Sequence, residues 1–76
     1  MTSALLRSLA DGFRKRSQDL DKINNSASYW YALASIDYRY AADQLDDGND
    51  WRRFMRSARD YTRTARLMAK SGKPQG

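Results

Sequence analysis

Six basic residues recur at intervals of three or four near the end of this sequence, and they are the side chains best suited to chemistry. They are Arg52, Arg56, Arg59, Arg63, Arg66 and Lys70. Because an α-helix has about 3.6 residues per turn, this spacing predicts a single basic ridge along one helix face. A guanidinium group donates paired hydrogen bonds to phosphate or carboxylate oxygens. The basic ridge therefore predicts a binding site for an anionic partner.

Charge is unevenly distributed along the chain. The span 51–70 carries seven basic residues and one acid, whereas the span 19–50 carries two basic residues and seven acids, in a chain of net charge +5. A solvated helix usually interleaves opposite charges at neighbouring turns, which limits repulsion. Two interpretations of the basic ridge remain open. Either it binds an external anion, which we favour, or it is a solvated face whose repulsion the acidic span partly relieves.

The residue types on which catalysis usually depends are missing. The chain contains no histidine and no cysteine, and all nine of its acidic residues are aspartates. It therefore lacks the common general base, the thiol nucleophile and the usual zinc ligands. A glycine-rich phosphate loop is also missing. We expect a protein that is not an enzyme and that uses no cofactor and no metal.

The size of the chain limits how it can be stabilised. A domain of 76 residues buries a modest fraction of its surface, and without cysteine it cannot form disulfides. Self-association is the remaining route, so we expect a homodimer. The apolar runs are too short to cross a membrane, and no signal-peptide pattern is visible. We expect a cytoplasmic protein without membrane contact.

The apolar periodicity predicts three helical segments, at about 3–23, 26–46 and 50–70, within a single domain of residues 1–70. The first segment either continues or breaks near Ser17, which could cap a new helix. The polar run 46–50 contains Gly48 and predicts a turn, with Asn49 or Asp50 as the cap of the helix that follows. This run lacks the ligand spacing of a calcium loop. The remainder, 71–76, is predicted to be a flexible tail.

The second and third segments are predicted to pair as an antiparallel hairpin, because their connection is short. Alanines recur every seven residues in both segments, as in the seam of a close-packed coiled coil. Folding about Gly48 places these alanines opposite large side chains, which fills space without voids. Asp37 falls at this seam, where it either pairs with Arg59 or stays hydrated at the edge. The fold class is therefore all-α, a small bundle of three helices.

A second stripe of apolar residues runs along the middle segment, nearly opposite the seam. It consists of Tyr29, Leu33, Ile36 and Tyr40. A helix with apolar residues on two sides usually has neighbours on two sides. Either the first segment covers the second stripe, or the stripe forms a dimer or partner surface.

No sequence signature identifies a family. In size, missing catalytic residues and polarised charge, the chain is similar in type to small inhibitors carried by phages and other mobile elements. The leading hypothesis is a non-catalytic regulatory or inhibitory protein. It would bind an anionic protein surface or a nucleoprotein complex through the basic ridge, aided by the second stripe. The alternatives are direct binding of DNA or RNA and a structural role in a helical assembly.

Overall fold

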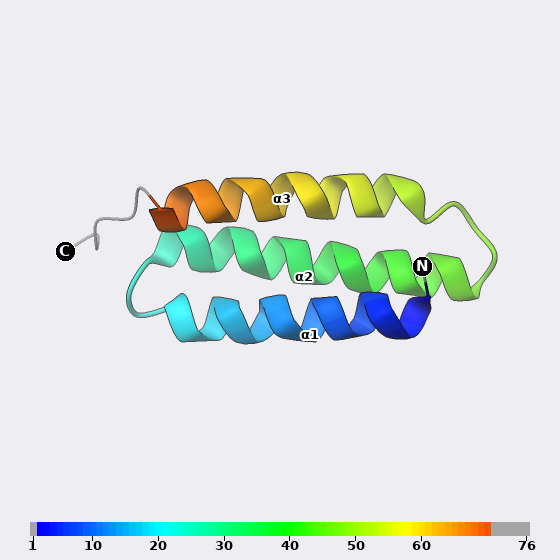
Figure 1. The fold of residues 1–76 in the computed structure, drawn as a ribbon, viewed down its shortest axis with the longest axis horizontal. Helices are drawn as coiled ribbons and strands as arrows, with labels where there is room; N and C mark the ends of the chain where they lie inside the picture. Colours follow the sequence, from blue (N-terminus) through cyan, green and yellow to red (C-terminus); the bar gives the residue numbers. More distant parts are fainter. Residues whose placement is uncertain (1, 71–76) are drawn as a thin grey trace.

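The computed structural model describes residues 2–70, which form three antiparallel helices (Figure 1). Helix α1 spans Ser3–Leu20, α2 spans Asn25–Asp46 and α3 spans Arg52–Lys70. The predicted all-α class and the antiparallel α2–α3 hairpin are confirmed. The predicted tail at 71–76 lies outside the described residues.

Short polar side chains cap the first two helices. The hydroxyl of Thr2 accepts a hydrogen bond from the amide of Leu5 at 3.2 Å. The side-chain oxygen of Asn24 accepts one from the amide of Ala27 at 3.0 Å. Each bond satisfies an amide that has no partner within the first turn of its helix. These caps determine where α1 and α2 begin.

The turn between α2 and α3 forms where the sequence predicts it. Gly48 has a φ of +74°, in the left-handed region that glycine adopts without steric cost. The amide of Arg52 donates to Oδ1 of Asp50 at 3.1 Å, so Asp50 caps the start of α3. The chain therefore reverses within a few residues and returns α3 along α2.

Helix α2 lies between the other two helices. Both α1 and α3 pack on it, and no Cα atom of α1 comes within 8 Å of a Cα atom of α3. Two rows of small buried residues on α2 allow both approaches. The row toward α1 contains Ser28, Ser35 and Ala42, and the row toward α3 contains Ala27, Ala34 and Ala41. At about 100° of rotation per residue, these rows lie roughly a quarter-turn apart around α2.

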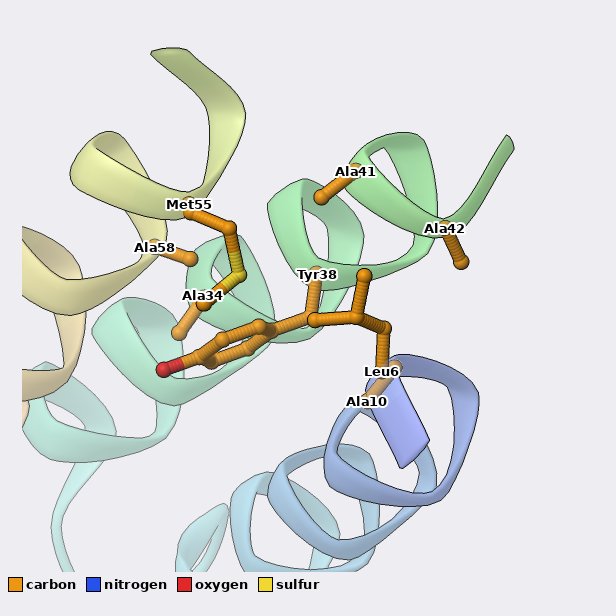
Figure 2. Packing of buried hydrophobic residues seen from close by; sticks show 8 residues of the cluster. All are labelled: Leu6, Ala10, Ala34, Tyr38, Ala41, Ala42, Met55 and Ala58. Carbon is orange, nitrogen blue, oxygen red and sulfur yellow. The ribbon is translucent and has the colours of Figure 1, made fainter. Parts of the chain in front are cut away.

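Large side chains fill the angle between these two rows. Figure 2 shows Tyr38 of α2 surrounded by Leu6 of α1 and by Met55 and Ala58 of α3. The ring of Phe13 from α1 stacks on Tyr38 at 5.4 Å between centroids, and also on Tyr31 at 5.8 Å. Stacked aromatic rings contribute beyond the area that they bury. These rings join α1 to α2 on the side that faces α3.

A reciprocal pair of hydrogen bonds locks α1 to α2. The hydroxyl of Ser17 donates to the carbonyl of Ser28 at 2.8 Å, and the hydroxyl of Ser28 donates to the carbonyl of Ser17 at 2.7 Å. Both serines are buried. Helix α1 is unbroken, so Ser17 is not the cap of a new helix. Its short side chain instead satisfies a polar contact at a helix crossing.

This pair predicts a coupled response to mutation. Ser17→Ala and Ser28→Ala should each lower the free energy of unfolding by about 1 kcal/mol, because each removes a buried hydrogen bond between the helices. The two hydroxyl oxygens also lie 3.1 Å apart, so the double variant should lose less free energy of unfolding than the two single variants combined. Urea unfolding of the four proteins measures this coupling, with the exposed Ser8→Ala as a control that should change little. Strict additivity would show that the two hydroxyls act independently.

Candidate functional site

The basic ridge forms as predicted, along the outer face of α3. All six of its residues are exposed, and within residues 2–70 none of them forms an ion pair. Helix α3 buries a neighbouring side, where Met55, Ala58, Thr62 and Ala65 pack on α2. Since that buried side determines the rotation of α3, it leaves the six basic side chains exposed.

The acidic span of the chain forms its ion pairs away from the basic ridge. Arg7 of α1 lies 3.0 Å from Asp43 and 2.7 Å from Asp46, and Arg39 lies 3.3 Å from Asp11. Hydrogen bonds from Ser3 and Arg7 hold the pKa of Asp46 below its ordinary value. Among the described residues, no ion pair therefore relieves the repulsion within the basic ridge.

Asp37 is a partly buried carboxylate on the side of α2 next to α3. Burial raises its pKa above the ordinary value, because desolvation disfavours the charged form. Within the described part of the chain it forms no ion pair, so the possible pairing with Arg59 is not present. Of the two predicted arrangements, the structure shows the second, in which Asp37 stays partly exposed at the edge of the seam.

Helix α1 does not cover the second stripe. It packs on a different side of α2, through the Ser17–Ser28 pair. Tyr29, Ile36 and Tyr40 remain 59%, 48% and 51% exposed, and Leu33 is partly buried. The ring of Tyr40 leans on Phe54 of α3, at 5.8 Å between centroids. Of the two interpretations, coverage by α1 is wrong, and the second stripe is available on the surface.

A hollow between α1 and α3, which we call the notch, was not predicted from the sequence. It consists of two adjoining hollows of about 330 and 360 Å³. They share Leu9 and Phe13 of α1 and Arg66 of α3. Arg59 and Arg63 of the basic ridge also line it. The notch therefore joins part of the basic ridge to an apolar surface on α1.

The position of α1 around α2 creates this notch. Phe13 of α1 and Tyr38 of α2 line it, and Tyr31 stacks on Phe13 at 5.8 Å between ring centroids. The guanidinium carbon of Arg16 lies 5.5 Å from the centre of the Tyr31 ring. Leu5 lines the notch and is 51% exposed. The sequence contains no local signal for this surface, because the notch depends on how α1 and α3 are placed around α2.

The described residues offer no other class of site. Across 2–70, no three acidic, histidine or cysteine side chains gather where they could hold a metal ion. None of the helices in that range is long and apolar enough to cross a membrane. Comparison with protein-family models, with curated proteins and with solved structures finds no match to this chain.

The partial burial of Asp37 predicts that removing its charge raises the thermal stability of the protein, by an amount that depends on pH. Its pKa is raised in the folded state, so its ionisation weakens the fold as the pH rises through that folded pKa. Asp37→Asn should therefore raise the melting temperature at pH 7. Below pH 3.8, the ordinary value for the group, Asp37 is protonated in both states and the gain should shrink toward zero.

Thermal unfolding between pH 3 and pH 8, followed by circular dichroism, measures this effect. Asp21→Asn makes the same change in net charge at an exposed position and serves as the control. If Asp37→Asn raises the melting temperature equally at pH 3 and at pH 8, the desolvation of Asp37 is contradicted.

Proposed function

We propose that this chain is a non-catalytic regulatory or inhibitory protein that occupies an anionic surface of a macromolecular partner with its basic ridge. The observation that carries this proposal is a row of six exposed basic side chains with no ion pair among the described residues. Like charges at neighbouring turns repel each other and destabilise a helix. An anionic partner would remove that repulsion and use the field of the basic ridge for attraction.

Two cations outside the ridge are already engaged in ion pairs. Arg7 and Arg39 already pair with aspartates, so these cations are less available to a partner. The basic ridge also lies on a helix that is packed on α2, which fixes the backbone positions of the arginines in one line. Fixed donors bind an anionic surface at a lower entropic cost than mobile ones. We propose an acidic protein surface as the partner, in the cytoplasm.

Reversing charge on the basic ridge tests this proposal. The variant Arg56→Asp, Arg63→Asp should bind poly-L-glutamate at least about tenfold more weakly than the parent, a loss of about 1.4 kcal/mol or more. Both positions are exposed, so the helicity should persist. Fluorescence anisotropy at low salt measures the affinity, and circular dichroism of the same samples checks the fold.

A matched control separates the ridge from net charge. Lys15→Asp, Arg53→Asp removes two exposed cations outside the basic ridge and changes the net charge equally. Equal losses in the two variants would show that the ridge is only a solvated face. If the parent binds duplex DNA of any sequence more tightly than poly-L-glutamate, with a steep salt dependence, the function is direct binding of nucleic acid.

Self-association through the second stripe is a further part of the proposal. Three of its four side chains are exposed on one face of α2, away from the basic ridge. A hollow of about 470 Å³ lies beside Ile36 and Tyr40, where a side chain of a second copy could enter. A symmetric dimer pairs the same patch on both copies. Such a dimer would leave the basic ridge of each copy free.

Sedimentation equilibrium at micromolar concentrations tests the dimer. The parent should sediment as a dimer, and Ile36→Arg should sediment as a monomer because it places a charge at the centre of the apolar patch. Leu67→Arg changes an exposed leucine on α3 and should leave the dimer intact. A parent that stays monomeric throughout the concentration range would refute association through this stripe.

A further inference from the structure

The three helices occupy three corners of a bundle that has room for four. The rows of small residues on α2 lie about a quarter-turn apart, so α1 and α3 flank α2 on adjacent sides. Their Cα atoms stay more than 8 Å from each other. The notch lies in the remaining corner. A fourth helix placed there would contact α1 and α3 directly and would lie over Tyr38.

The two walls of the notch differ in chemistry. The wall on α1 presents Leu5, Leu9 and Phe13, and Leu5 is half exposed. When a partner removes such apolar surface from water, the free energy of the complex is lowered. The wall on α3 presents Arg59, Arg63 and Arg66. A ligand that fits both walls therefore needs apolar groups along one side and carboxylates along the other.

Gly12 leaves open space on α1 within the notch. It lies inside the helix at a position where a Cβ atom would meet nothing within 4 Å. Its φ is not positive, so neither backbone geometry nor packing within residues 2–70 requires a glycine. A glycine inside a helix costs stability relative to alanine. Gly12 lines the notch, where the missing side chain leaves room for close approach.

We propose that the notch binds an amphipathic helix of a partner protein, with apolar side chains against α1 and carboxylates against Arg59, Arg63 and Arg66. This inference rests on the proposed function, because it assigns half of the basic ridge to a defined ligand. An amphipathic helix in a groove is a recurring mode of protein recognition. The bound helix would complete the bundle and pair three free guanidinium groups.

The apolar wall distinguishes this ligand from nucleic acid. A phosphate backbone does not benefit from exposed leucines. The two tyrosine rings that stack on Phe13 at the notch are too buried to stack on bases, since Tyr31 and Tyr38 are 2% and 6% exposed. Arg52, Arg56 and Lys70 lie outside the two hollows that make up the notch. They remain free to contact other parts of the same acidic protein.

A synthetic peptide of about three heptads provides the probe, with leucines on one face and glutamates along one flank. The parent protein should bind this glutamate peptide and increase its helicity. A peptide with lysines in place of the glutamates should bind at least about tenfold more weakly, and so should a scrambled peptide of the same composition. Fluorescence anisotropy of labelled peptide and circular dichroism of the mixture give the two readouts.

Substitutions at Gly12 test the location. Gly12→Trp should fill the notch and lower the affinity for the glutamate peptide at least about tenfold, while poly-L-glutamate is still bound. Gly12→Ala should raise the melting temperature, which confirms that this position does not need glycine for folding. Gln18→Trp adds the same bulk at an exposed position of α1 that does not line the notch, and it should leave peptide binding unchanged.

Failures of the two proposals are distinguishable. If the scrambled peptide binds as tightly as the amphipathic one, or if Gly12→Trp has no effect, the notch is not a helix site and the basic ridge still binds anions. If neither the glutamate peptide nor poly-L-glutamate binds the parent, the ridge assignment fails as well. If Ile36→Arg loses binding of the glutamate peptide and Gly12→Trp retains it, the site lies on the second stripe and the inference is overturned.

Discussion

The close approach of two helices to adjacent sides of α2 is the constraint on which the rest of the structure depends. Small side chains make both approaches possible: Ser28 faces α1, and Ala34 faces α3. In a close-packed interior, a larger side chain in either row would move a whole helix. The rotation of α1 and α3 around α2 follows from these rows. That rotation then decides which residues of the outer helices reach the surface.

The stacked rings of Phe13, Tyr31 and Tyr38 lie next to the surface that we propose for binding. Phe13 stacks on Tyr31 and Tyr38 and fills the angle between the outer helices, so α1 and α3 do not close over α2. The apolar side of α1 and the arginines of α3 consequently face a common notch. The ion pairs of Arg7 and Arg39 lie elsewhere and leave these arginines unpaired within 2–70. The notch therefore combines an apolar surface, exposed by the packing of α1, with the unpaired arginines of α3.

Local signals allowed much of the fold to be predicted, whereas the site depends on contacts between helices. Gly48 and Asp50 act within the turn itself, so the hairpin could be read from the sequence. Ser17 has the same short polar side chain as a cap, but its partner lies in another helix, eleven residues away. The notch depends on which side of α2 receives α1. Two sides of α2 carried apolar residues, and periodicity alone could not choose between them.

The central claim is that the notch, and not the second stripe, receives an acidic amphipathic helix. Backbone amide chemical shifts of the isotope-labelled protein, recorded as the glutamate peptide is added, test it most directly. The account predicts shift changes along both walls, at Gly12 and Phe13 on α1 and at Thr62 and Arg66 on α3, with none at Ile36. Changes centred on Ile36, or spread along α3 without any on α1, would contradict it.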